Sequence, residues 1–463
     1  MAIILPANTL SGAYEVANSC RFNDGDSAYM HKTPGSEGAR EKWTFSCWIK
    51  KATNGIRQHI MTSYYNASNF CTINFESDDQ LNFYDYNGGS VNGKRHTTRV
   101  FRDNSAWYNI VCVWDTTNGT TEDKIRIYVN GVRETVFDTN SAASDNDSRM
   151  NHTLPIRIGA YDASSYYFDG YISEVVFIDN LALDATSFGE FDEDSPTIWK
   201  PIDVSGLTFG TNGFYLDFED SANLGNDANG GTDLTEVNLA AADQATDTPT
   251  NSFATMNPLI PGVSNITYSE GNLIMTQTTA AWVKSNSTLG MSNGKWYWEA
   301  KWIGDNSGTG SWMVLGVDNT DTATPYPTSS TTAVGWKKNG DLDLATVAQT
   351  DIATYAEGDV LSVALDMDND AVYFRKNGAS WENSGDPTSG SDKTGAYSLP
   401  VANSTYFATI SPYDTSIAGM NFGGCPSFAI SSGNADADGY GNFEYAVPTG
   451  YYALCTKNLA EYG

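Results

Sequence analysis

Lys124-Ile-Arg-Ile-Tyr-Val129 alternates charged or polar residues with apolar ones and runs directly into Asn130-Gly131. A period of two residues is typical of a half-buried β-strand, because successive side chains point to opposite faces of the sheet. Asn-Gly favours a type I′ turn, whose two central residues both need a positive φ. The stretch therefore predicts a β-hairpin.

The same alternation recurs along the chain, and helical periodicity is nearly absent. Further strands are predicted at Trp43–Ile49 and Tyr108–Trp114. Ala371–Lys376 is another predicted strand, and it leads into a second Asn-Gly pair at Asn377-Gly378. One short helix is predicted over Asn180–Phe191. We therefore expect an all-β protein with two antiparallel β-sandwich (jelly-roll) domains in series.

Composition limits the partners that the chain can bind. Its 463 residues include 56 acidic and 26 basic ones, which gives a net charge of −30. Nucleic acids and anionic membrane surfaces attract clustered Lys and Arg, so this charge argues against both and predicts no nucleic-acid binding and no membrane insertion. No apolar run is long enough to span a bilayer, and the run at Met1–Pro6 lacks the features of a secretory signal.

The six cysteines form no CxxC pair, and Cys47 and Cys112 lie within alternating apolar runs. We expect these two to be buried, unpaired thiols in a protein made in a reducing cytosol.

A change of composition divides the chain. Between Glu219 and Pro258 the sequence is rich in Asp, Asn, Ala, Thr and Gly, and Phe253 is its only aromatic residue. Such a span predicts a linker or a segment wrapped on a neighbouring domain. The expected organisation is an N-terminal anchor segment (1–18), a first sandwich (19–200), the linker or wrapping segment (201–258), and a second sandwich with a C-terminal extension (259–463).

The first half resembles a laminin-G-like, concanavalin A-like domain over roughly residues 16–190. The order of the motifs carries the resemblance more than any single motif. They are the strand Trp43–Ile49, Ile127-Tyr-Val-Asn-Gly131, Ile156-Arg-Ile-Gly-Ala160 and Phe168-Asp-Gly-Tyr-Ile-Ser-Glu174.

The second half resembles a SPRY domain over about residues 262–455. This resemblance is the more specific of the two. Its motifs are Gly294-Lys-Trp-Tyr-Trp-Glu299, Val334-Gly-Trp336, Ala364-Leu-Asp-Met-Asp368, the hairpin Phe374–Gly378 and Asn421-Phe-Gly423.

The tandem of these two domains resembles virion-associated fibre or adhesin proteins of tailed phages, particularly marine (cyanophage-like) ones. The resemblance implies a homo-oligomeric protein on the virion surface, assembled in the bacterial cytoplasm with other virion proteins. Phage fibres usually trimerise, but the sequence shows no heptad stalk. A trimer is therefore expected from the resemblance alone.

Aromatic residues outside the predicted strands are the main functional signal. The chain holds 26 Tyr, 20 Phe and 12 Trp, more than two sandwich cores require. Flat rings beside Asp and Asn suit a host-surface glycan, and Tyr is also enriched at protein interfaces, so a protein receptor or a neighbouring subunit fits the same residues. The candidate ligand-binding residues are Tyr64, Tyr65, Tyr84, Tyr86, Tyr161, Tyr166, Tyr167 and Tyr326.

One acidic loop suggests calcium, the one cofactor that the sequence indicates. Asn434, Asp436 and Asp438 place oxygen atoms at alternate positions, and Gly439 stands sixth, as in the first half of a calcium loop. The twelfth position is Tyr445 rather than Glu. An ordinary Asp/Gly turn is the alternative.

Catalytic motifs are not found, and we expect no catalytic residues and no enzyme activity. The four histidines form no metal or nucleophile motif and are expected in solvated loops. Glycan hydrolysis needs two suitably spaced carboxylates. Glycanases that resemble concanavalin A typically carry a Glu-x-Asp-x-x-Glu-like stretch on one strand. The nearest stretches here, Glu76-Ser-Asp78 and Glu190-Phe-Asp192, both lack the second Glu. A host-binding virion protein is thus the main hypothesis. A capsid-decorating protein without receptor binding and a polysaccharide depolymerase are the alternatives.

Overall fold

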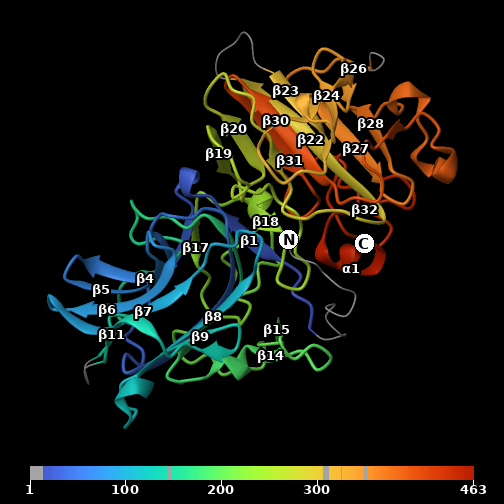
Figure 1. Ribbon diagram of the computed structural model, residues 1–463. Coiled ribbons are helices and arrows are strands. Elements are labelled where there is room, and N and C mark those ends of the chain that lie inside the picture. The colour runs from blue at the N-terminus through green and yellow to red at the C-terminus, as the bar shows by residue number, and fades with distance from the viewer. Residues whose placement is uncertain (1–13, 144–146, 306–311, 325, 349–351) are drawn as a thin grey trace. The chain divides into compact units, whose positions relative to one another are not determined.

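The computed structural model describes residues 14–143, 147–305, 312–324, 326–348 and 352–463 (Figure 1). Antiparallel strands are the main regular structure of the described residues and helical turns are few, which confirms the predicted all-β class. It divides between Thr250 and Asn251 into an N-terminal unit and a C-terminal unit. Within the described ranges, no helix has the length and apolar character needed to cross a membrane.

The N-terminal unit contains two large antiparallel sheets, here called sheet A and sheet B, and a small hairpin of β14 (Gly189–Phe191) and β15 (Trp199–Pro201). Sheet A has the order β10 (Val132–Arg133), β9 (Ile125–Val129), β8 (Tyr108–Asp115), β3 (Lys42–Lys51), β13 (Gly170–Asp179), β1 (Ser19–Phe22) and β18 (Gln244–Ala245), and β16 (Phe214–Leu216) also pairs with β13. Sheet B has the order β11 (Phe137–Ser141), β7 (Ser90–Val100), β6 (Gln80–Asn87), β5 (Asn69–Phe75), β4 (Gln58–Asn66), β12 (Ile156–Ile158), β2 (Tyr29–Lys32) and β17 (Thr235–Val237).

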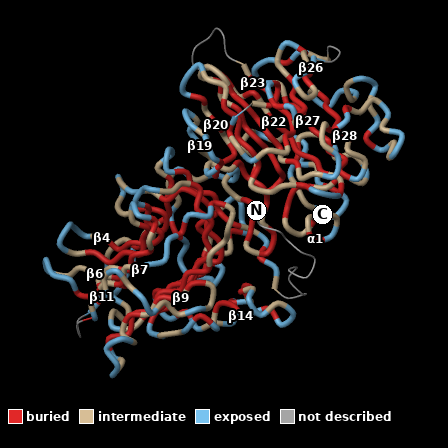
Figure 2. The backbone as a smooth tube through the Cα atoms, in the orientation of Figure 1, coloured by how far each residue is buried: buried red, intermediate tan, exposed pale blue. Residues whose placement is uncertain are grey.

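Alternating side chains from sheets A and B build one apolar core. Figure 2 shows the buried stretches of these strands in red. The ring of Trp43 on β3 packs edge-on against Phe83 on β6, with 5.4 Å between ring centroids, and so joins the two sheets. Cys47 and Cys112 are fully buried and unpaired, as predicted.

The C-terminal unit contains two more sheets, here called sheet C and sheet D. Trp336 of sheet D packs on Phe374 of sheet C, with 5.8 Å between ring centroids. Sheet C has the order β19 (Ile266–Ser269), β20 (Ile274–Gln277), β31 (Ser416–Asn421), β22 (Lys295–Asp305), β27 (Val360–Asp366), β28 (Ala371–Lys376) and β29 (Tyr397–Ser398), and β32 (Tyr452–Ala453) runs parallel to β22. Sheet D has the order β21 (Ser285–Asn286), β30 (Phe407–Tyr413), β23 (Trp312–Asp318), β24 (Val334–Lys337), β25 (Leu342–Leu344) and β26 (Val347–Ala348).

One of the two predicted hairpins forms as expected, because Asn130-Gly131 joins β9 directly to β10. The hairpin predicted at Asn377-Gly378 is wrong: β28 pairs with β27, which precedes it, and with β29, which begins only at Tyr397. Asn130 and Gly131 have φ values of 47° and 76°, and Asn377 and Gly378 have φ values of 50° and 67°. These are the left-handed conformations of a type I′ turn. The Asn-Gly pairs therefore set where β9 and β28 end.

The prediction of a helix over 180–191 is wrong. Only the 3₁₀ turn η4 (Ala185–Ser187) forms there, and β14 follows it. A Cβ at Gly189 would overlap the ring of Trp199, so close packing of β14 on β15 replaces a continued helical turn.

A true helix, α1 (Thr456–Tyr462), forms instead near the C-terminus. In the part of the chain that the structure describes, the other helical turns are short 3₁₀ segments. They are η2 (Asp24–Asp26), η3 (Thr121–Asp123), η5 (Ala241–Asp243), η6 (Pro327–Ser329), η7 (Glu382–Ser384) and η8 (Pro387–Asp392).

The strand-poor segment 201–258 is divided between the two units. Its residues up to Thr250 carry β16, β17 and β18, which add to sheets A and B, and its remainder belongs to the C-terminal unit. Most of the predicted anchor segment, residues 1–13, lies outside the described residues. Tyr14 and Val16 lie in the N-terminal unit, where the backbone N–H of Val16 donates to the Thr250 hydroxyl at 3.2 Å.

Candidate functional site

The outward face of sheet B, turned away from sheet A, carries most of the predicted tyrosines. On β6, Phe83 points into the core, so its neighbour Tyr84 and then Tyr86 point outward. Phe70 of β5 lies opposite Tyr86 in the register, and its ring centroid is 5.2 Å from that of Tyr84 and 5.5 Å from that of Tyr86. β-strand periodicity thus places these three rings together.

A loop after β12, Ala160–Phe168, folds over the same face. The ring of Tyr161 lies 4.8 Å from that of Tyr64 on β4 and 5.7 Å from that of Phe70. The ring of Tyr166 lies 5.9 Å from that of Tyr161 and is 46% exposed. We call this group the tyrosine face; its members are His59, Tyr64, Phe70, Tyr84, Tyr86, Tyr161 and Tyr166.

Local hydrogen bonds hold the covering loop in place. Oδ1 of Asp162 accepts hydrogen bonds from the backbone N–H of Ser164 at 2.8 Å and from its hydroxyl at 2.9 Å. The backbone N–H of His59 donates to the carbonyl oxygen of Tyr166 at 3.3 Å. The loop is therefore tied both to itself and to β4, which keeps Tyr161 and Tyr166 over the sheet.

Two predicted tyrosines lie beside this group. Tyr65 follows Tyr64 and is 65% exposed. Tyr167 stacks on Tyr29 of β2 with 6.3 Å between ring centroids, and its hydroxyl donates to the carbonyl oxygen of Ala163 at 3.0 Å. Tyr167 borders the tyrosine face beside Tyr166, whereas Tyr65 lies at a register shift near the end of β4 and has no ring contact with the face among the described residues.

His59 is part of the tyrosine face, with its ring centroid 4.6 Å from that of Tyr161, although no motif in the sequence predicts this. It lies on β4 and is only 3% exposed, and His31 and His96 also lie on strands, so the prediction of solvated loops is wrong for these three. Nδ1 of His59 lies 2.6 Å from the hydroxyl oxygen of Thr72 and 3.1 Å from that of Thr62. Burial lowers the pKa of His59 to about 3, so the ring is neutral.

Tyr326 lies in the C-terminal unit and belongs to a different cluster. Its ring stacks on Trp282 at 4.6 Å between centroids, and Trp282 stacks in turn on Tyr413 at 4.5 Å. Tyr326 and Trp282 also line a pocket of about 220 Å³ beside Trp312 on the outer side of sheet D. Tyr326 therefore lies in a different unit from the other candidate tyrosines.

The acidic loop of the C-terminal unit is hydrogen-bonded as a turn. Oδ1 of Asp436 accepts from the backbone N–H groups of Asp438 and Tyr440, at 3.0 and 2.9 Å. Its Oδ2 accepts from the backbone N–H of Ala453 and from the side chain of Asn458, at 2.9 and 2.8 Å.

The other two calcium candidates also have protein partners. Asp438 accepts a hydrogen bond from the hydroxyl of Tyr462, and the side chain of Asn434 donates to the carbonyl oxygens of Phe443 and Glu444. Among the described residues, no group of three or more His, Cys, Asp or Glu side chains is arranged to hold a metal ion. The calcium site stays a prediction.

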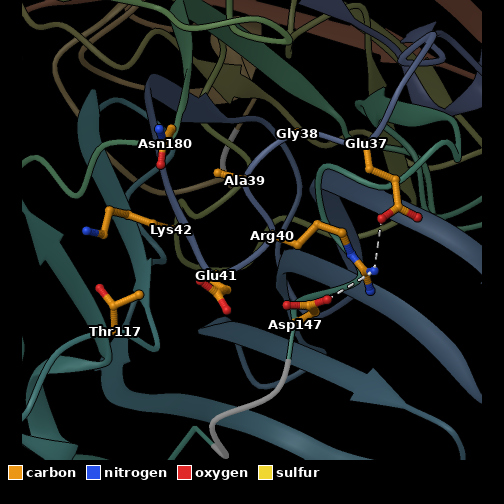
Figure 3. Close-up of a pocket in the computed structure, with 9 residues that line it drawn as sticks. All are labelled: Glu37, Gly38, Ala39, Arg40, Glu41, Lys42, Thr117, Asp147 and Asn180. Carbon is orange, nitrogen blue, oxygen red and sulfur yellow. Dashed lines mark hydrogen bonds and ion pairs between the residues drawn. The ribbon is translucent and has the colours of Figure 1, made fainter.

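A polar pocket of about 280 Å³ lies at one end of the N-terminal unit (Figure 3). Arg40 points between Glu37 and Asp147 and pairs with both, at 3.4 and 3.3 Å. Nε of Arg40 also donates to the carbonyl oxygen of Ser148 at 2.9 Å. The positive charge of Arg40 is therefore paired with the carboxylates of Glu37 and Asp147. No aromatic side chain is among the residues that line the pocket.

The carboxylate pairs considered for hydrolysis form structural ion pairs. Glu76 binds Nε of Arg57 at 2.7 Å, and its other oxygen accepts from the side chain of Asn74 at 3.1 Å. Glu190 and Asp192 both pair with Lys200, at 3.5 and 3.3 Å.

Comparison with known families agrees with this architecture. Residues 24–186 match the family described as the concanavalin A-like lectin/glucanases superfamily (Laminin_G_3), and residues 295–424 match the SPRY domain. The chain therefore carries these two domains in series, as the sequence motifs predicted. A search of curated proteins found no match.

Several solved structures are similar to parts of the chain. The SPRY domain of human HERC1 is 15% identical, with a TM-score of 0.30, over 38% of this chain and 99% of that one. A putative carbohydrate binding protein from Bacteroides ovatus is 17% identical, with a TM-score of 0.33, over 48% of this chain and 58% of that one. A SAP-like pentraxin from Limulus polyphemus is 16% identical, with a TM-score of 0.26, over 37% of this chain and 80% of that one.

Proposed function

We propose that this chain, which carries a concanavalin A-like domain and a SPRY domain, is a non-enzymatic binding protein that takes a glycan on its tyrosine face. One observation carries the proposal. Tyr64, Tyr84 and Tyr161 come from three separate stretches of sequence, and they converge on one outward sheet face. Core formation does not require this convergence, because the face points away from sheet A.

The chemistry of the face suits a sugar chain. Sugar rings present C–H groups that pack on aromatic faces, and their hydroxyl groups need polar partners. Polar groups lie in the same sheet: Oδ1 of Asn82 on β6 is buried without a hydrogen-bond partner in the described part of the chain. A ligand hydroxyl that reaches this oxygen would satisfy it, and Tyr166 provides an exposed ring at the border.

A protein receptor is the alternative ligand. Tyr is enriched at protein interfaces because its large ring combines with a polar hydroxyl group. Tyr326, Trp282 and Tyr413 form a second aromatic cluster, on the SPRY domain, and this cluster supports the alternative.

We further propose a place for this binding: the surface of a tailed-phage virion, on a fibre or another appendage that contacts the host. The resemblance of the domain tandem to phage fibre proteins supports this proposal. Several copies in a homo-oligomer would multiply weak single-site binding by avidity. Gold-labelled antibodies against the protein should then decorate the particle surface in electron micrographs, and light scattering should give an oligomer; unlabelled particles contradict the proposal.

A glycan array with the full-length chain tests the function. We expect binding to a subset of glycans without release of shorter sugars, and at least about tenfold weaker binding by Tyr84→Ala, since stacked aromatic contacts contribute 1 kcal/mol or more each. Tyr326→Ala is the matched control in the other unit and should bind as the wild type does. Loss of binding in Tyr326→Ala alone would place the ligand on the SPRY domain, and released oligosaccharide would contradict the non-enzymatic function.

A further inference from the structure

One row of residues crosses sheet B beneath the tyrosine face. The antiparallel registers align His31 of β2, Arg157 of β12 and Thr62 of β4. The row continues through Thr72 and Tyr84 to Lys94 of β7. Because neighbouring strands lie about 4.8 Å apart, Arg157 and Lys94 stand roughly 19 Å apart at the two ends of a polar and aromatic strip.

The Arg157 guanidinium has no acceptor for two of its nitrogens. Nε and Nη1 are shielded from solvent, and neither has a hydrogen-bond partner among the residues that the structure describes. A shielded, charged donor without an acceptor is unfavourable, so such a group indicates an absent partner. That partner has to be an acceptor, and an anion satisfies a guanidinium best.

The surroundings of Arg157 do not supply that anion. Burial raises the pKa of Asp162, but hydrogen bonds from Ser164 and Ser165 and the charge of Arg157 together lower it. Oδ1 of Asp162 is occupied by those two serines, and no ion pair joins Asp162 to Arg157. Burial first, and the charge of Arg157 second, lower the pKa of His31, and an imidazole side chain cannot supply a negative charge in any case.

Lys94 is a second cation on the row. Its ammonium group lies 5.0 Å from the ring centroid of Tyr84, which is a cation–π contact. Within the described ranges Lys94 has no acidic partner. Other cations nearby do have one: Arg99 of β7 binds Glu134 at 2.6 Å, and Arg57, just before β4, binds Glu76 at 2.7 Å. Two unpaired cations on one face are notable in a chain of net charge −30.

We propose that the tyrosine face selects acidic glycans, and that Arg157 binds a carboxylate or sulfate group of the sugar chain. This inference rests on the proposed glycan-binding function. Arg157 offers a planar fork of N–H donors, which matches the two oxygens of a carboxylate. Lys94 attracts a second acidic group further along the chain, and the rings between them pack on the intervening sugars. A nucleic acid fits less well, because it requires many clustered cations.

Titration calorimetry of the full-length chain with three polysaccharides tests the inference. Polygalacturonate offers carboxylates, dextran sulfate offers sulfates, and dextran is neutral. We expect at least one acidic probe to bind more tightly than dextran, and Arg157→Gln to weaken that binding about tenfold or more, as expected for loss of a charged hydrogen bond. Arg157→Lys should recover only part of the affinity, because it keeps the charge without the fork.

The matched control is Arg99→Gln, which removes the same charge from the same sheet where the arginine is already paired. It should change the affinity by less than about twofold. Lys94→Gln is a second test if Arg157→Gln does not fold, and it should also weaken acidic binding. Equal losses in Arg99→Gln and Arg157→Gln would overturn the inference, and so would unchanged acidic binding in Arg157→Gln.

The outcome with dextran separates this inference from the function on which it rests. Binding of dextran at least as tight as that of both acidic probes overturns the acidic preference and leaves glycan binding in place. If the chain binds none of the three probes and no glycan on the array, both proposals are wrong.

Discussion

The carboxyl group of Glu174 is buried within a β-bulge of β13, where this residue has a φ of 50°. The hydroxyl groups of Tyr215 and Tyr14 donate hydrogen bonds to its Oε2, at 2.8 and 3.2 Å. Burial raises the pKa of Glu174 to about 7, although both hydrogen bonds act in the opposite direction. The folded chain therefore keeps this proton at pH values at which the unfolded chain has lost it.

The sign of the pH dependence follows from this proton. Between the ordinary pKa of 4.5 and about 7, the folded state binds one more proton than the unfolded state, so stability falls as the pH rises. Glu174→Gln removes the charge, and we expect it to raise the free energy of unfolding at pH 8 by roughly 2–3 kcal/mol. Urea denaturation of variant and wild type at pH 4 and pH 8 measures the difference, which should nearly vanish at pH 4. A constant difference would contradict the assignment.

Single residues also show what sequence reasoning reached on sheet B and what it missed. Tyr84 and Tyr86 are predicted outside the strands, which is wrong because both lie on β6; their alternation with Phe83 nevertheless turns them outward. The sequence does not identify His59 or Arg157 as site residues, because His59 belongs to no catalytic or metal motif and the motif that contains Arg157, Ile156-Arg-Ile-Gly-Ala160, indicates only a strand. Their importance depends on β12 lying between β2 and β4, a long-range pairing that local periodicity does not encode.

At the scale of elements, the turn between β9 and β10 combines two constraints on Gly131. Its φ is 76°, and a Cβ there would overlap the ring of Trp199. Gly55 has the same φ but open space around its Cβ position. We expect Gly131→Ala to destabilise the chain by roughly 2–4 kcal/mol and Gly55→Ala by only about 1 kcal/mol. Thermal unfolding of both variants checks this, and equal costs would show that Trp199 is not a constraint.

The acidic turn around Asp436 belongs to the C-terminal unit and is hydrogen-bonded to both β32 and α1. Its carboxylate accepts four hydrogen bonds, two of them from Ala453 and Asn458. We expect Asp436→Ala to lower the free energy of unfolding by roughly 2–4 kcal/mol, because buried donors lose their acceptor.

Removal of calcium tests the other interpretation of the same turn. Because protein donors occupy the Asp436 oxygens, we expect EDTA and added CaCl₂ to leave the Tm of the wild type unchanged. A Tm that rises with CaCl₂ and falls again with EDTA would establish the calcium site at Asn434, Asp436 and Asp438.

The helix α1 and the segment 180–191 show which elements could not be predicted from the sequence. The β9–β10 hairpin was predictable because Asn-Gly acts locally. The helix α1 was not predictable, because its seven residues carry no clear helical period. It is held by tertiary contacts such as the hydrogen bond from the side chain of Asn458 to Asp436. Tertiary contacts of this kind also explain why 180–191 forms β14 rather than a helix.

At the scale of the whole molecule, two domain classes and their order were predictable from ordered motifs, whereas the binding surface was not. The motifs at 43–49 and 156–160 identify strands of one sandwich, but only the folded order of sheet B shows which loops meet. Although the chain has a net charge of −30, the outward face of sheet B carries two cations, Arg157 and Lys94, without an acidic partner among the described residues.

Hydrogen–deuterium exchange of the full-length chain, with and without the glycan that binds best on the array, tests most directly that ligand binds on the tyrosine face. Ligand contact slows the exchange of backbone amides that it covers or stabilises. We predict slower exchange in β4 to β7 and in residues 160–168, with no change around Tyr326. Protection confined to the C-terminal unit, or to the polar pocket beside Arg40, would contradict the account.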